Sequence, residues 1–132
     1  MDEAAISPAS ENILLIDNEQ FIVVAYRDGL ERAGYKVTLA EDGQSALDQM
    51  LLDPPNLVLL ELLVPKLNGF ELIQAMKQEP KLLDIPILVL TNLSQQADRE
   101  EAESLGAQDF FVKSDVSLQD VLKRINSLLG YA

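Results

Sequence analysis

Five polar side chains in this sequence could do chemistry, because they stand at the ends of short apolar runs. Asp17 and Asn18 follow the first run, Glu61 follows the third, Thr91 closes the fourth and Lys113 follows the fifth. The chemistry available is that of carboxylates, an amide, a hydroxyl and an ammonium, since the chain has no histidine and no cysteine. Ser-His-Asp catalysis, thiol nucleophiles and zinc sites of imidazole or thiolate ligands are therefore excluded.

Strands and helices must bring these side chains together, and the sequence predicts that they form one α/β domain. Five apolar runs alternate with five helical patterns, and the nearly continuous apolar runs favour parallel strands covered on both faces. Such alternation predicts a doubly wound open sheet, in which the carboxyl ends of the strands meet at one edge. We expect the strands at residues 13–16, 37–40, 57–60, 87–90 and 110–112.

Capping signals predict the limits of the helices. Gly34 and Gly106 are expected to end the first and fourth helices, and Asn68, Ser94 and Ser117 to cap the beginnings of the third, fourth and fifth. The expected helices are about 19–33, 43–52, one from the cap at 68 to before residue 80, one from the cap at 94 to 106, and one from the cap at 117 onward.

Composition limits the class of protein further. The 132 residues fit one domain, and 22 acidic against 10 basic residues give a net charge of −12. This charge argues against direct binding of nucleic acid, whose phosphates attract Lys and Arg. No run approaches the roughly 18 apolar residues of a membrane span, and residues 1–11 lack the features of a signal peptide. We predict a cytoplasmic protein without membrane contact, with a flexible tail over 1–11 and a domain over 12–130.

Four stretches of the chain together resemble the receiver domain of bacterial response regulators. They are ILLIDNE, NLVLLELLVPKLNGFELI, DIPILVLTN and GAQDFFVKS, and the resemblance covers about residues 12–129. It implies the flavodoxin-like fold, with a single five-stranded parallel sheet of order 2-1-3-4-5. It also implies two-component phosphorelay signalling, in which an aspartate after strand three accepts a phosphoryl group from a partner's phosphohistidine.

The resemblance implies roles for four of the residues, and two of them depart from the family pattern. Asp17 and Asn18 stand where an acidic pair helps to hold Mg²⁺, with the backbone carbonyl of Leu63 as a further ligand. Asn18 lacks the charge of that pair, so we predict weak Mg²⁺ binding. Glu61 stands at the phosphoacceptor position, where one extra methylene moves the carboxylate outward by about 1.5 Å and makes in-line transfer costly. These departures favour a degenerate receiver over the alternative, a competent receiver that is phosphorylated at Glu61 with Mg²⁺.

The length of Glu61 allows two interpretations of its role. The carboxylate extends toward Thr91 and Lys113, the positions that coordinate the phosphoryl oxygens in the family. It could bias the domain toward the activated-like conformation without phosphorylation, although with less charge than a phosphoryl group. The other interpretation is a structural salt bridge with Lys113.

Three further positions follow from the resemblance. Asn92 stands where the family prefers a very small residue, so it is expected to narrow access for a phosphodonor. Thr91 and Phe110 occupy the switch positions, and plain core packing of Phe110 is the alternative. Ser114 replaces the family's proline after Lys113, so we predict a trans Lys113–Ser114 peptide bond.

Partners are expected on two surfaces. On the first helix, 100° steps place Val23 and Val24 on the charged outer side with Arg27, and Phe21 on the opposite half. A sensor histidine kinase or a phosphotransfer protein could dock there, although isolated exposed valines are common. The fourth helix, fifth strand and fifth helix form the family's usual face for a homodimer or an effector protein.

A flavodoxin-like enzyme or ligand-binding protein is the rival prediction. The sequence has no GxGxxG or Walker-type glycine loop, and the segment after the first strand is acidic where a flavodoxin needs a phosphate loop. We therefore predict a signalling receiver that is not an enzyme and that acts by protein–protein interaction.

Overall fold

The computed structural model describes residues 11–131, and all five predicted strands are present there. They form one parallel sheet of order β2-β1-β3-β4-β5. Each strand limit lies within one residue of its prediction, and the predicted tail falls, apart from Glu11, outside the described residues. The strands are β1 (Asn12–Ile16), β2 (Lys36–Ala40), β3 (Leu57–Leu60), β4 (Ile87–Thr91) and β5 (Asp109–Val112).

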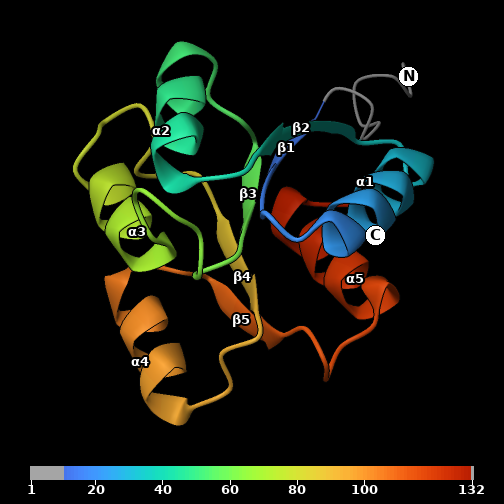
Figure 1. The fold of residues 1–132 in the computed structure, drawn as a ribbon. Coiled ribbons are helices and arrows are strands. Elements are labelled where there is room, and N and C mark those ends of the chain that lie inside the picture. The colour runs from blue at the N-terminus through green and yellow to red at the C-terminus, as the bar shows by residue number, and fades with distance from the viewer. Residues whose placement is uncertain (1–10, 132) are drawn as a thin grey trace.

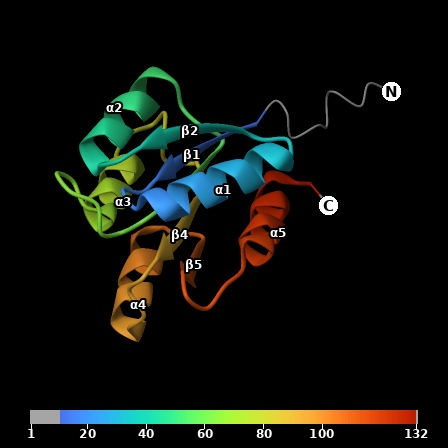
Figure 2. The ribbon, with the colours of Figure 1, turned by 45° about the vertical axis from the view of Figure 1, so that its right-hand side comes forward.

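Helices cover both faces of this sheet and give the domain three layers. Figures 1 and 2 show α2, α3 and α4 on one face and α1 and α5 on the other. This is the doubly wound arrangement that the alternation of strands and helices predicts. The helices are α1 (Gln20–Arg32), α2 (Gly43–Leu52), α3 (Gly69–Lys77), α4 (Gln96–Leu105) and α5 (Leu118–Leu129). Within residues 11–131, no helix combines the length and apolar character that crossing a membrane requires.

Of the three predicted N-terminal caps, two are correct and one is wrong. Asn68 and Glu71 form a full capping box at the start of α3, and Ser117 caps α5 in the same way. Ser94 does not cap α4. The N-cap residue is Gln95, and its side chain makes no capping hydrogen bond. Ser94 comes one residue before the N-cap, the position from which a side chain bonds to the first helical amides.

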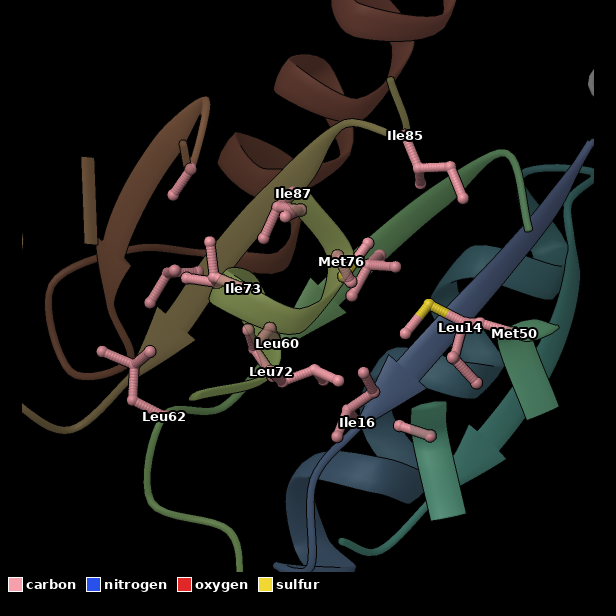
Figure 3. Packing of buried hydrophobic residues seen from close by; sticks show 14 of the residues in the cluster. Leu14, Ile16, Met50, Leu60, Leu62, Leu72, Ile73, Met76, Ile85 and Ile87 are labelled. Atoms are coloured by element: carbon pink, nitrogen blue, oxygen red, sulfur yellow. The ribbon is translucent and has the colours of Figure 1, made fainter. Parts of the chain in front are cut away.

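The strands supply two separate cores from alternating residues. Leu14 and Ile16 of β1 pack with Ile73 and other buried side chains on the α2–α3–α4 face (Figure 3). Ile13 and Leu15 enter the opposite core beneath α1 and α5. Successive residues of a strand point to opposite faces, and both faces of this sheet are buried. Apolar residues are therefore needed at every position, which explains the continuous apolar runs in the sequence.

A close approach of two backbones fixes the loop between β3 and α3. The N–H of Gly43, the first residue of α2, donates to the carbonyl of Pro65 at 3.3 Å. A Cβ atom at Gly43 would lie 1.8 Å from the carbonyl oxygen of Leu67, so the contact requires glycine. The loop that begins at Glu61 is thereby held against α2.

Candidate functional site

Glu61 is the first residue after β3, and other groups occupy both of its carboxylate oxygens. Oε2 accepts a hydrogen bond from the hydroxyl of Thr91 and another from the N–H of Leu63 at 3.1 Å. Oε1 lies 2.8 Å from Nζ of Lys113. The residue is 5% exposed. β3, β4 and β5 are neighbours in the sheet, so their carboxyl ends bring Glu61, Thr91 and Lys113 together as the sequence predicts.

The ammonium of Lys113 lies among three carboxylates. Its Nζ is 2.9 Å from Oδ2 of Asp17, 3.0 Å from Oε1 of Glu19 and 2.8 Å from Oε1 of Glu61. Burial disfavours the charged amine, but the hydrogen bonds that it donates to Glu61, Asp17 and Glu19 prevail and raise the pKa of Lys113. The side chain is therefore a fixed cation, and it uses all three of its N–H donors here.

Asp17 is the most secluded carboxylate of the site, at 2% exposure. Burial raises the pKa of Asp17, while its hydrogen bond to Lys113 acts in the opposite direction. Its Oδ1 accepts the N–H of Glu19 at 2.9 Å, a local turn that leads the chain from β1 into α1. The same turn directs Glu19 toward Lys113. Glu19 is the contact that the sequence prediction missed, and its place two residues after Asp17 was the available signal.

Three predicted site residues take little part in this cluster through their side chains. Asn18 is exposed, and so is Asn92, the residue that follows Thr91. Leu63 is 57% exposed and contributes its N–H, which donates to Glu61. The structure thus brings together Asp17, Glu61, Thr91 and Lys113, and leaves the two asparagines at the surface.

The family resemblance implies a Mg²⁺ ion at this position, and the donor set does not fit one. Asp17 and Glu61 direct one oxygen each at the ammonium of Lys113, which lies between them. The exposed Asn18 offers an uncharged amide in place of a carboxylate. No group of three or more histidine, cysteine, aspartate or glutamate side chains within residues 11–131 is arranged to hold a metal ion. Weak Mg²⁺ binding remains a prediction.

The two predicted switch residues lie on the same face of the sheet. Phe110 is paired with Val89, and Thr91 follows Val89 by two residues along β4. Phe110 is buried, at 3% exposure. The guanidinium of Arg99 in α4 lies 5.7 Å from the centre of its ring and is itself 3.6 Å from Asp109. The aromatic side chain is thus held inward between the sheet and α4.

The loop after β5 has the backbone geometry that the sequence predicts. The described part of the chain has no cis peptide bond, so the Lys113–Ser114 bond is trans. The N–H of Lys113 donates to the carbonyl of Thr91 at 2.8 Å. This hydrogen bond continues the β4–β5 pairing by one residue, so the Lys113 side chain remains in the site.

The predicted partner face of α1 needs a correction. Val23 is buried, at 9% exposure, whereas Phe21 is 80% and Val24 65% exposed. At 100° per residue Phe21 lies about 140° from the buried Tyr26, whereas Val23 lies about 60° from it. The exposed apolar pair is therefore Phe21 and Val24, beside the exposed Arg27. The buried residues of α1 are Val23, Tyr26 and Leu30.

Charged residues on the α4–β5–α5 face pair within the chain. Asp109 of β5 lies 3.1 Å from Arg124 of α5 and 3.6 Å from Arg99 of α4. Arg99 also lies 3.5 Å from Glu103 of its own helix. A homodimer through this face remains a prediction.

Comparison with known proteins gives a family. Residues 13–126 match the response regulator receiver domain. The chain is 36% identical to the alkaline phosphatase synthesis transcriptional regulatory protein PhoP of Bacillus subtilis, over 91% of this chain and 49% of PhoP. It is also 36% identical to the response regulator SaeR of Staphylococcus aureus, over 89% of this chain and 50% of SaeR.

Solved structures agree with this match. The chemotaxis response regulator CheY4 of Vibrio cholerae superimposes with a TM-score of 0.82 at 25% identity, covering 89% of this chain and 98% of CheY4. The chain spans about half the length of PhoP and SaeR. With its sheet order, its cluster of strand-end side chains and this match over most of its length, the chain belongs to the response regulator receiver domains of two-component signalling.

Proposed function

We propose that this chain is a cytoplasmic receiver domain that acts without phosphorylation, through contacts with other proteins. The observation that supports this most directly is the state of Glu61, the residue at the phosphoacceptor position. Both of its oxygens accept hydrogen bonds from Thr91, Leu63 and Lys113, and only 5% of its surface is exposed. A carboxylate oxygen that attacks phosphorus needs a free lone pair directed at the donor. The oxygens of Glu61 are engaged in hydrogen bonds instead, and little of the side chain is open to a donor.

Two departures from the family pattern lower acceptor activity by independent routes. The extra methylene of Glu61 shifts the reacting oxygen by about 1.5 Å, and phosphoryl transfer depends on in-line positioning to within about an ångström. Asn18 removes a negative charge that would attract Mg²⁺. The carboxylates of Asp17 and Glu61 pair with the single ammonium of Lys113 instead.

Glu61 is suited to stand in place of a phosphoryl group. It accepts hydrogen bonds from Thr91 and Lys113, which are the two positions that the family uses to coordinate phosphoryl oxygens. A salt bridge with Lys113 alone would leave the Thr91 hydroxyl free, so the second contact favours this role over a purely structural pair. The buried position of Phe110 on the same face of the sheet is consistent with an activated-like arrangement. The carboxylate carries less charge and fewer oxygens than a phosphoryl group, so the mimicry is partial.

The output of such a domain is association with other proteins. Phe21 and Val24 at the start of α1 lie beside the site and are the residues on which a sensor histidine kinase or a phosphotransfer protein would dock. The α4–β5–α5 face would bind an effector or a second copy of the chain. The net charge of −12 disfavours direct contact with nucleic acid.

Intact-mass measurement tests the proposal. The protein is incubated with phosphoramidate and Mg²⁺, a reaction in which the P–N bond breaks, ammonia leaves and a carboxylate oxygen bonds to phosphorus. We expect the mass of this chain to stay unchanged. A phosphoryl adduct located at Glu61 would instead establish the competent receiver. A receiver with aspartate at the acceptor position, treated in parallel, shows that the reagent is active.

A second measurement separates mimicry from a plain salt bridge. Glu61→Gln keeps the length of the side chain but removes its charge. If Glu61 holds the activated-like arrangement, this variant should alter the NMR signals of Phe110, which does not bond to Glu61, as well as those of its direct partners Thr91 and Lys113. If the NMR signals change only for the residues in contact with Glu61, the structural salt bridge is the interpretation that remains.

A further inference from the structure

The outer edge of β2 carries backbone groups that no other strand of the described chain pairs. β2 ends the sheet and has β1 as its single neighbour. The N–H of Lys36 and the carbonyl of Ala40 bond toward β1, at 3.0 Å each. In a parallel strand the intervening residues face the other way, so Val37 and Leu39 direct their N–H and C=O groups outward. Such an edge is a template for another strand.

One side chain partly occupies this edge. Nε2 of Gln49 in α2 donates to the carbonyl of Leu39 at 3.0 Å. Gln49 is exposed, so its amide can exchange this hydrogen bond for water at small net cost. The amide takes the position that a backbone donor of an added strand would take.

Two cavities flank Gln49, and both include it in their lining. The first has a volume of about 240 Å³ and largely apolar walls that include Leu14, Met50 and Leu52. The second has a volume of about 330 Å³ and a more polar lining at the carboxyl end of β2. An apolar cavity of about 150 Å³ holds a benzene molecule, so each has room for one large side chain. Leu52 is 89% exposed, which leaves an apolar rim on the first cavity.

Every charged residue that lines these cavities is acidic. Asp53 lines the first cavity, and Asp17, Glu41 and Asp42 line the second. Asp17 is paired within the site described above, and Lys66 lies 3.8 Å from Asp42. Asp53 and Glu41 have no ionic partner within residues 11–131. A basic partner is therefore favoured locally, and the net charge of −12 attracts it from a distance.

We infer that the outer edge of β2 binds an extended segment of a partner protein in which apolar and basic residues alternate. Its backbone pairs with Val37 and Leu39 as an added strand and displaces Gln49 from the Leu39 carbonyl. Successive side chains of a strand point to opposite faces. An apolar side chain on the α2 face fills the first cavity, and an adjacent arginine or lysine on the α1 face reaches the second, whose lining includes Val23 of α1 and Leu39. A second copy of this chain fits less well, because it is equally acidic and its β2 offers Lys36 as its only basic residue.

A peptide titration tests this surface with the intact chain. The probe is a short acetylated and amidated peptide of alternating valine and arginine, added to ¹⁵N-labelled protein. We expect the amides of Val37 and Leu39 to gain protection from hydrogen exchange, while that of Thr38, which faces β1, stays unchanged. The same peptide with glutamate in place of arginine, or with N-methylated backbone amides, should bind at least about tenfold more weakly.

Two matched variants test the part played by Gln49. Gln49→Ala frees the Leu39 carbonyl, so the peptide should bind about three to ten times more tightly. Gln44→Ala is the control, because Gln44 is exposed on the same helix and bonds only to Asp48 of that helix. The inference is overturned if Val37 and Leu39 gain no protection, if the glutamate peptide binds equally well, or if the two variants behave alike. Concentration-dependent protection of these amides in the protein alone would also overturn it and assign the edge to a second copy.

Discussion

The carboxylate of Glu61 and the ammonium of Lys113 form an ion pair of 2.8 Å between side chains that are 5% and 6% exposed. One residue follows β3 and the other follows β5, so the pair spans β4 and encloses the Thr91 hydroxyl. Loss of Lys113 would leave the buried carboxylates of Glu61 and Asp17 without their cation, whereas Lys113 without Glu61 would keep Asp17 and Glu19. The pair therefore determines both the stability of the site and its chemistry.

Removal of the cation should destabilise the fold strongly. Lys113→Met keeps most of the side-chain volume and leaves Asp17 and Glu61 buried without their partner. We expect the free energy of unfolding to fall by about 3–5 kcal/mol, as measured by urea denaturation. Lys66→Met is the control, since Lys66 is 69% exposed and 3.8 Å from Asp42, and it should cost less than about 1 kcal/mol. Equal losses in the two variants would contradict this account of the site.

Restoring the family residues should restore the acceptor. Glu61→Asp withdraws the carboxylate by one methylene, and Asn18→Asp returns a charge for Mg²⁺. We expect the double variant to gain one phosphoryl group from phosphoramidate and Mg²⁺ by intact mass, and each single variant to gain less. A double variant that folds and stays unmodified would show that features other than these two residues block the reaction.

The sequence predicts the strands and the strand-end cluster because the signals for both are local. Leu57–Leu60 is apolar throughout since both of its faces are buried, and the next residue must emerge at the edge of the sheet. The contact between Glu19 and Lys113 joins residues 94 positions apart, so the local pattern places Glu19 near the end of β1 but does not identify Lys113 as its partner. Its only trace is the turn in which Asp17 accepts the N–H of Glu19.

The outward face of α1 was predicted wrongly because apolar residues nearly surround its first two turns. Phe21, Ile22, Val23, Val24 and Ala25 are consecutive, so hydrophobicity alone does not fix the rotation of the helix. The buried side is fixed by Tyr26 and Leu30 further along the helix, which pack into the core beneath α5. Phe21 lies at the exposed end of the helix, one residue after its start.

Adjacent valines of α1 should therefore differ in their contribution to stability. Val23→Ala removes buried methyl groups, and we expect a loss of about 1–3 kcal/mol in the free energy of unfolding. Val24→Ala changes an exposed side chain and should stay within about 0.5 kcal/mol of the parent protein. Urea denaturation of the two variants side by side measures the difference. A larger loss for Val24→Ala would reverse the assignment of the two faces.

Alkaline pH should weaken the hydrogen bond that Tyr35, the residue before β2, makes with α5. Its hydroxyl donates to the side chain of Asn126, and burial, with nearby Tyr131 and Glu11, raises the pKa of Tyr35 from 10.0 to about 12. A pKa raised in the folded state gives a stabilisation that is complete below pH 10 and is lost as the pH rises toward 12.

Tyr35→Phe cannot titrate, and near neutral pH it should be less stable by about 1 kcal/mol, since it lacks the hydrogen bond. Urea denaturation across this pH range should show the gap between the two proteins narrowing, and Lys113, whose pKa is also raised, affects both equally. A gap that stays constant up to pH 12 would mean that the Tyr35 hydroxyl titrates alike in the folded and unfolded chains.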